Sequence, residues 1–192
     1  MVTSKESGSR RWEIVGAKTI YRDAWVTHTQ EHVRLPNGHE ISRYNILEQN
    51  DFCTMIAVTS SGLVPLVKQY KHGALEVVLE FPAGLVDEEE TAMDAAVREL
   101  REETGYAGEV VLAGRLLTNP TRNRNAAHIF VVTDAVPVAE PLLEVTEDID
   151  VELIPIRQIR ELVASGELRD VGSLAAYTLA RSAFPDLGWD EA

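Results

Sequence analysis

The chain has 192 residues, 45% hydrophobic and 26% charged, which predicts one domain with a sizeable core and excludes a largely disordered chain. Acidic residues outnumber basic ones by 31 to 18, so the chain lacks the basic footprint of a duplex nucleic-acid binder. Without an apolar run of membrane-spanning length or a secretory leader, it is expected in the cytoplasm, with no membrane partner.

Three N-terminal stretches mix apolar and polar residues as strands do, and Asn37-Gly38 between the second and third is a strong hairpin signal. These stretches predict an antiparallel β lobe over residues 11–48, preceded by a flexible segment at residues 1–10. The three expected strands are 12–21, 25–35 and 39–47.

Residues 49–184 are predicted to form the main body of the protein, followed by a tail at 185–192. One helix is clear, because apolar residues recur at spacings of three and four from Ala92 to Leu100 and Gly105 suits the position after the helix end. Strands with interleaved helices predict an α+β fold with a mixed sheet between helices. The expected strands are 52–59, 63–70, 77–81, 109–117, 128–133 and 151–155, and the further helices are 156–165 and 173–181. Cys53, the single cysteine, is expected to be a buried thiol.

The clear helix carries carboxylates on one face, because Glu99, Glu102 and Glu103 stand at i, i+3 and i+4. The alternative is a solvated acidic face. However, Glu102 and Glu103 lie at the C-terminal end of the helix, where the helix dipole opposes negative charge. Oxygen ligands of this kind suit Mg²⁺ or Mn²⁺, so the arrangement favours a metal site. Arg98 lies two helical turns after Glu90, a spacing that allows an ion pair bracing the preceding loop.

The stretch from Gly84 through Glu90 to "RELREETGY" (98–106) resembles the Nudix box of the Nudix hydrolases. All of its fixed polar and glycine positions are present, and only Tyr106 departs from the usual aliphatic residue. The resemblance implies an α/β/α sandwich and a metal-dependent enzyme that hydrolyses a nucleoside diphosphate linked to another group, X. It also implies four metal ligands, which are Glu99, Glu102, Glu103 and the carbonyl of Ala83.

The segments "KQYKHG" (68–73) and "LEFPAG" (79–84) resemble the ADP-ribose and nucleoside-diphosphate-sugar pyrophosphatase branch of that family. In that branch the N-terminal sheet forms a homodimer and contributes to the nucleoside pocket. Lys71 stands where the branch often has an arginine that reaches phosphate. Tyr21, Trp25 and Phe52 are open alternatives between stacking on a base and packing in the core.

Two downstream loops carry further candidates. "PTRNRNAAH" (120–128) replaces the usual segment of the branch, and its Arg122 and Arg124 are expected either to clamp phosphates or a ribose, or to form a basic surface loop. In the acidic stretch 142–152, the branch implies Glu147 as a further metal ligand, with Glu144 as an alternative general base. The competing interpretation is an acidic loop without a catalytic role.

The leading hypothesis is therefore a Mg²⁺- or Mn²⁺-dependent pyrophosphatase that converts ADP-ribose or a related nucleoside-diphosphate sugar to a nucleoside monophosphate and a sugar phosphate. The alternatives are another substrate of the same chemistry, such as GDP-mannose, NADH or a dinucleoside polyphosphate, and a Nudix-fold sensor without turnover. Retention of every glutamate of the box argues against the sensor.

Overall fold

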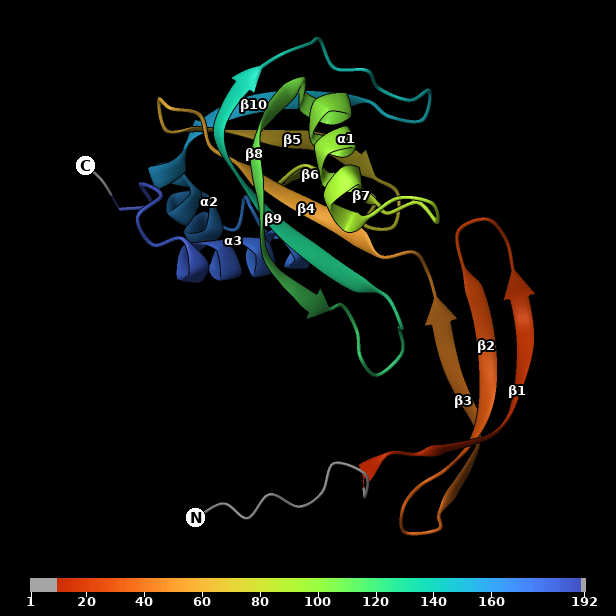
Figure 1. Ribbon diagram of the computed structural model, residues 1–192. Helices are drawn as coiled ribbons and strands as arrows, with labels where there is room; N and C mark the ends of the chain where they lie inside the picture. The colour runs from red at the N-terminus through yellow and green to blue at the C-terminus, as the bar shows by residue number, and fades with distance from the viewer. Residues whose placement is uncertain (1–9, 191–192) are drawn as a thin grey trace, which may run out of the picture. The chain divides into compact units, whose positions relative to one another are not determined.

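The computed structural model describes residues 10–190, which form two compact units (Figure 1). The first unit comprises the described residues up to Asn50 together with Leu117–Asn125. The second comprises Asp51–Leu116 and the described residues from Ala126 onward. The predicted flexible segment at 1–10 lies outside the described residues, except for Arg10.

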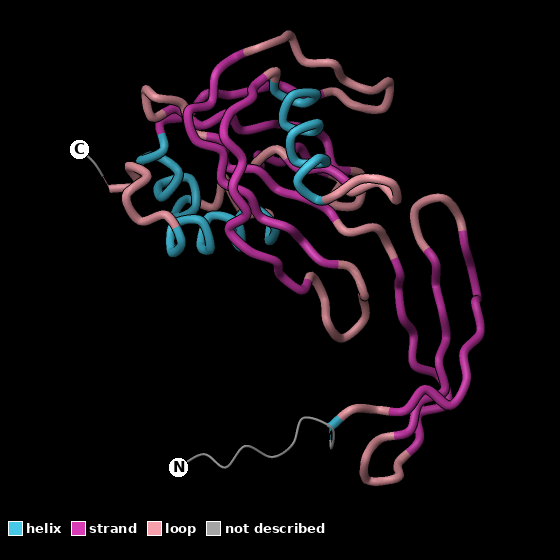
Figure 2. The backbone as a smooth tube through the Cα atoms, viewed as in Figure 1, coloured by secondary structure: helices cyan, strands magenta, loops and turns pink. Residues whose placement is uncertain are grey.

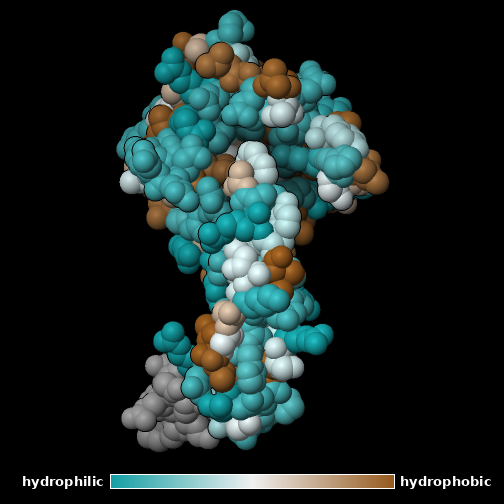
Figure 3. Space-filling view, turned by 90° about the vertical axis from the view of Figure 1, so that its right-hand side faces the viewer, coloured by the Kyte–Doolittle hydropathy of each residue, from teal (hydrophilic) through white to brown (hydrophobic). Residues whose placement is uncertain are grey.

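The first unit contains a three-stranded antiparallel sheet, as the sequence predicts. Its strands are β1 (Glu13–Arg22), β2 (Thr27–Arg34) and β3 (Glu40–Glu48), in the order β1-β2-β3. Every residue of β1 is exposed, and apolar side chains lie on the surface of this unit (Figure 3). The large apolar residues exposed at or beside β1 are Trp12, Ile14, Val15, Ile20, Tyr21 and Trp25.

A loop from the middle of the chain, 117–125, belongs to the first unit rather than the second. Figure 2 distinguishes the loops from the strands of this mainly β structure. The backbone amide of Leu47 donates to the carbonyl of Arg122 over 2.8 Å, and the Tyr44 hydroxyl donates to the carbonyl of Thr121 over 2.6 Å. The loop is therefore tied to β3 by hydrogen bonds between residues more than seventy positions apart, a pairing that no local sequence pattern indicates.

The second unit contains two further sheets. One has the order β7-β4-β9-β8, and its strands are β7 (Ala83–Leu85), β4 (Phe52–Ala57), β9 (Ala126–Pro137) and β8 (Tyr106–Leu117). Strand β4 pairs in parallel with β9 and antiparallel with β7, so this sheet is mixed, as predicted. The other is antiparallel, with the order β10-β5-β6, and its strands are β10 (Ile149–Pro155), β5 (Leu63–Lys71) and β6 (Glu76–Glu80).

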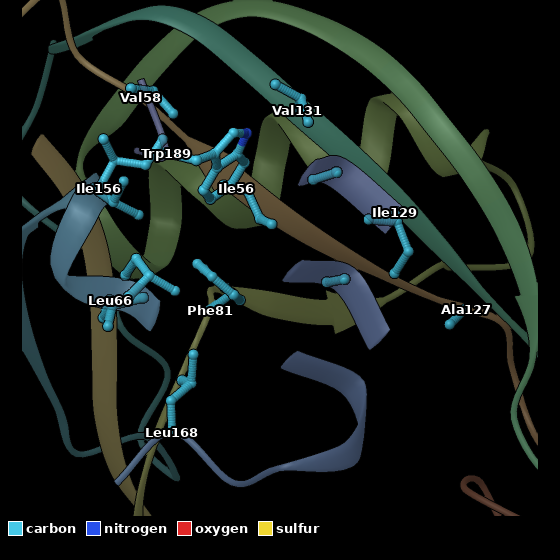
Figure 4. Close-up of a cluster of buried hydrophobic side chains, with 14 residues drawn as sticks. Ile56, Val58, Leu66, Phe81, Ala127, Ile129, Val131, Ile156, Leu168 and Trp189 are labelled. Atoms are coloured by element: carbon cyan, nitrogen blue, oxygen red, sulfur yellow. The ribbon is translucent and has the colours of Figure 1, made fainter. Parts of the chain in front are cut away.

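Helices cover both sides of the mixed sheet, which makes the second unit an α/β/α sandwich (Figure 1). Successive side chains of a strand point to opposite faces. Met55 of β4 accordingly packs in the cluster with α1 (Ala92–Thr104), whereas Ile56 packs in the cluster with α3 (Val171–Ala183) (Figure 4). The third helix is α2 (Ile159–Ser165). Cys53 is buried on the α1 side, as predicted. None of the helices within residues 10–190 is long and apolar enough to cross a bilayer.

The structure differs from the predicted elements mainly around the box. Ala83–Leu85 forms the short strand β7, which the sequence analysis did not anticipate, because three residues are too few to show an alternating pattern. The predicted helix at 156–165 begins as a 3-10 turn, η2 (Ile156–Gln158), before continuing as α2. The described part of the predicted tail packs against the body, since Trp189 is 3% exposed and its indole N–H donates to the Phe184 carbonyl over 2.8 Å.

Candidate active site

Helix α1 positions the acidic cluster through well-formed ends. Thr91 caps the N-terminus by accepting from the Asp94 amide, and the Asp94 side chain accepts in return from the Thr91 amide. Gly105 ends the helix with a φ of 76°, a left-handed conformation that favours glycine. A Cβ at Gly105 would also lie 2.2 Å from the carbonyl oxygen of Ala139. The helix end therefore contacts the chain that leads to Glu144 and Glu147.

Glu103 is the most deeply buried carboxylate of the cluster. It is 3% exposed, and its Oε2 accepts a hydrogen bond of 3.0 Å from the Ala83 amide of β7. Burial raises the pKa of Glu103 to about 8, because removing water disfavours the charged form. The nearby carboxyl of Glu99 adds to this effect, whereas the Ala83 amide opposes it. The side chain lies directly against the backbone position that the sequence predicted to supply a carbonyl ligand.

Glu99 lies so closely against Gly84 that any side chain at this position would have to displace its carboxylate. A Cβ at Gly84 would lie 1.9 Å from the Glu99 Cδ, well inside contact distance. The box glycine is thus needed for space, since it admits the carboxylate onto the β7 backbone. Burial raises the pKa of Glu99, and the charges of Glu102 and Glu147 act in the same direction, while Arg98 opposes them.

The Arg98 guanidinium connects the acidic side chains to the loop before the helix. It donates to both carboxylate oxygens of Glu90, over 2.5 and 3.2 Å, which is the pair that the sequence spacing predicted. Its Nη1 also donates to Glu99 over 2.8 Å and to Glu102 over 3.1 Å, and its Nη2 donates to the Leu85 carbonyl over 3.1 Å. These acceptors raise the pKa of Arg98, so it stays fully charged.

The donor set suits a hard divalent cation. Glu99 and Glu102 both accept hydrogen bonds from the Arg98 Nη1, so these two carboxylates approach one positively charged group. In the arrangement described for residues 10–190, however, no three His, Cys, Asp or Glu side chains converge closely enough to hold a metal ion. A metal at these carboxylates would therefore require their side chains to rotate from this arrangement.

Lys71 of β5 pairs with Glu80 of β6, a residue absent from the sequence-based candidates. The Lys71 Nζ is 2.7 Å from the Glu80 carboxylate, and both charges act on the pKa of Glu103. Glu80 is almost fully buried, and burial raises its pKa although Lys71 opposes the effect. The available signal was a glutamate within an otherwise apolar run, "VVLEF", where an isolated charge is costly.

The structure separates the two candidates in the loop after β9. Glu147 is half-buried, and its charge is close enough to Glu99 to raise the pKa of Glu99. Glu144 is exposed, and its amide donates to the Glu147 carboxylate over 2.8 Å. Glu147 is thus brought to the acidic cluster, whereas Glu144 shapes the turn that carries it.

The two arginines of the 117–125 loop have different surroundings. Arg124 donates to Glu31 and to Glu48, each over 2.5 Å, and Glu31 is buried. Its guanidinium thus ties the loop to β2 and β3, which leaves less capacity for the phosphate clamp that the sequence suggested. Arg122 is exposed, and its backbone is fixed to Leu47.

An α/β/α sandwich in which two carboxylates of α1 lie against a short glycine-bearing strand is the arrangement that a Nudix box predicts. A model of the NUDIX domain matches residues 49–175, and the chain belongs to the Nudix family of hydrolases. Its box, expected from Gly84, Glu90 and residues 98–105, is the stretch that builds β7, the capping loop and the end of α1.

Several known proteins similar to this chain are named as pyrophosphatases of ADP-ribose or ADP-sugars. An ADP-ribose pyrophosphatase of Bacillus subtilis is 32% identical over 143 residues, covering 73% of this chain and 76% of the relative. An ADP-ribose pyrophosphatase of Mycobacterium tuberculosis is 29% identical, with 85% and 79% covered, and a mouse ADP-sugar pyrophosphatase is 34% identical, with 69% and 61% covered. A crystal structure of an ADP compounds hydrolase superposes with a TM-score of 0.82 at 21% identity, covering 94% of this chain and 97% of that one, which shows the shared fold.

Substituting Gly84→Ala tests the close approach of Glu99 to β7. The new Cβ has to displace the Glu99 carboxylate, and a misplacement of this order typically costs about 100-fold in rate. We expect turnover of a Nudix substrate to fall by roughly that factor while circular dichroism shows the fold retained. Gly73→Ala is the matched control, because a Cβ there meets nothing within 4 Å. Equal activity of the two variants would contradict the role assigned to Gly84.

The raised pKa of Glu103 predicts a pH-dependent stability in metal-free buffer. A carboxyl group whose folded pKa of about 8 exceeds its ordinary value of 4.5 favours folding at low pH, and this contribution is lost as the pH rises from 4.5 through 8. Urea unfolding of the chelator-treated protein should therefore give a free energy that falls by a few kcal/mol between pH 5 and pH 8. Glu103→Gln should flatten this dependence, and an unchanged slope in that variant would exclude Glu103 as its source.

Proposed function

We propose that this Nudix hydrolase cleaves the pyrophosphate bond of ADP-ribose or a related nucleoside-diphosphate sugar, giving a nucleoside monophosphate and a sugar phosphate. The observation that carries the proposal is the approach of Glu103 to the Ala83 amide and of Glu99 to Gly84, with Glu102 on the same Arg98 guanidinium as Glu99. The names of the relatives in Bacillus subtilis, Mycobacterium tuberculosis and mouse support ADP-ribose and ADP-sugars as the substrate class.

Mg²⁺ or Mn²⁺ is the proposed cofactor. Glu99, Glu102 and Glu103 would hold it, together with the Ala83 carbonyl and with Glu147, whose charge already reaches Glu99. When bound, a divalent cation neutralises diphosphate charge and lowers the pKa of a coordinated water. The chain's own contribution is to fix these oxygens on a rigid helix, to bring Lys71 to the phosphate side, and to place Glu147 where a carboxylate can serve as a ligand or as a base toward water.

Conservative substitutions in the helix test this function directly. Glu102→Gln and Glu103→Gln keep the size of the side chain and remove a charged ligand, so phosphate release from ADP-ribose, coupled through a phosphatase, should fall by at least 100-fold with Mg²⁺ present. Glu109→Gln, on the exposed part of β8, is the control and should match the unmodified protein. Turnover that survives both helix substitutions would overturn the assigned ligands, and binding of ADP-ribose without hydrolysis under either metal would favour a sensor.

We also propose that the protein is a homodimer formed through the sheet of the first unit. The fully exposed strand β1 and the exposed apolar side chains of Ile14 and Ile20 support this, since contiguous apolar surface commonly marks an interface. Light scattering at micromolar concentration should give twice the chain mass. Ile14→Glu with Ile20→Glu should give a monomer, whereas Val145→Glu, on a fully exposed residue of the second unit, should not. A monomeric unmodified protein would refute the dimer.

The cytoplasmic location stays a prediction.

A further inference from the structure

Glu80 of β6 is a buried carboxylate outside the acidic cluster of α1. Its side chain is 9% exposed, and its Oε1 lies 2.7 Å from the Lys71 Nζ and accepts a hydrogen bond of 2.9 Å from the Gln69 side-chain amide. A buried charge without partners is costly, so these contacts keep the carboxylate ionised. A buried ion pair contributes little net stability, however, so stability alone does not explain why the pair is present.

Lys71 reaches Glu80 by extending along the sheet. In the register of β5 and β6, Lys71 lies opposite Glu76, whereas Glu80 lies opposite Val67, four residues back along β5. Four residues of strand span about 13 Å, which requires an extended lysine side chain. The directly opposite carboxylate, Glu76, pairs with Arg169 instead. Glu80 therefore fixes where the Lys71 ammonium lies, and the extended chain has little slack.

The ammonium held in this way faces a cavity of about 710 Å³ in the second unit. Lys71 and Glu80 line this cavity together with Ala83 and Gly84 of β7. The charge of Lys71 opposes the burial that raises the pKa of Glu103, so the ammonium lies near the acidic cluster. Lys71 is 39% exposed, and an ammonium has three N–H donors, of which Glu80 occupies one. The remaining donors are available to an anion in the cavity.

We propose that Glu80 is a positioning residue for substrate binding, which holds the Lys71 ammonium where it contacts the diphosphate of the substrate. The proposal rests on the function proposed above, because that function supplies the diphosphate. Glu80 touches neither the diphosphate nor the bond that breaks, and it acts through Lys71. A free lysine side chain loses much rotational freedom when it binds an anion, and the pair with Glu80 removes most of that freedom before the substrate arrives.

Glu80→Asp tests the positioning, because it keeps the charge and shortens the side chain by one carbon–carbon bond, about 1.5 Å. The extended Lys71 side chain has no slack to follow the carboxylate, so its ammonium loses its fixed place. The KM for ADP-ribose with Mg²⁺ should therefore rise by about 10-fold. The kcat should stay within about twofold, since a contact made equally in the ground state and the transition state changes KM alone.

Two double variants separate positioning from a merely structural role. Lys71→Arg supplies a longer cation, so adding it to Glu80→Asp should bring the KM back to within about 3-fold of the unmodified protein. Adding Glu80→Asp to Lys71→Met should change the KM by less than about twofold, because the residue through which Glu80 acts is already gone. A full loss in the Lys71→Met background together with no rescue by Lys71→Arg would overturn the proposal and leave the proposed function intact.

Glu152→Asp is the matched control. Glu152 pairs with Lys68 of the same strand β5, at 3.5 Å, but both side chains of this pair are exposed. Shortening Glu152 should leave the KM unchanged, and a rise equal to that of Glu80→Asp would contradict a specific role of Glu80. Thermal unfolding should show all variants folded, and if Glu80→Asp does not fold, Glu80→Gln takes its place in the comparison with Lys71→Met.

Failure of the proposed function is distinguishable from failure of the positioning. If the unmodified protein hydrolyses no nucleoside-diphosphate sugar, the function fails, and the positioning is measured as protection of Lys71 from acetic anhydride by methylenediphosphonate with Mg²⁺. Mass spectrometry gives the acetylation of Lys71 relative to Lys68 in the same peptide chain. Protection in the unmodified protein that is lost in Glu80→Asp supports the positioning. Equal protection in both proteins, or none in the unmodified protein, overturns it.

Discussion

The guanidinium of Arg98 is the interaction on which the acidic site depends. Glu90, Glu99 and Glu102 would repel one another across the loop and the C-terminal part of α1, where the helix dipole also opposes negative charge. Arg98 donates to all three and to the Leu85 carbonyl, so one cation holds the helix, the loop and β7 together. Surface ion pairs contribute little singly, but this is a partly buried network with several simultaneous hydrogen bonds.

Strand β7 borders both the acidic cluster and a cavity of the second unit. Its Ala83 amide binds Glu103 and its Gly84 leaves room for Glu99, which brings the carboxylates onto the backbone. The same strand also borders a cavity whose lining includes the Arg169–Glu76 pair.

In the first unit, contacts between residues far apart in sequence give a loop arginine partners that its local sequence does not indicate. Arg122 and Arg124 suggest phosphate binding when considered as a short basic loop, but Glu31 and Glu48 engage Arg124 from strands far away in sequence. The loop is bonded to β3 of the small sheet, whose strand β1 exposes apolar side chains. Glu80 is the opposite case. The sequence assigned no role to this glutamate in an apolar run, whereas the structure pairs it with Lys71.

The sequence by itself determined the three N-terminal strands, the clear helix with its end at Gly105, the Glu90–Arg98 pairing and the family, since these depend on spacings of a few residues within one hairpin or within one helix and the loop before it. Only the tertiary structure decided that β7 exists, that the described part of the tail packs through Trp189, that Glu147 rather than Glu144 approaches Glu99, and that Arg124 is bound by carboxylates. Each of those features joins residues separated by many positions in the chain, and a local pattern carries no information about which distant side chain will supply the partner.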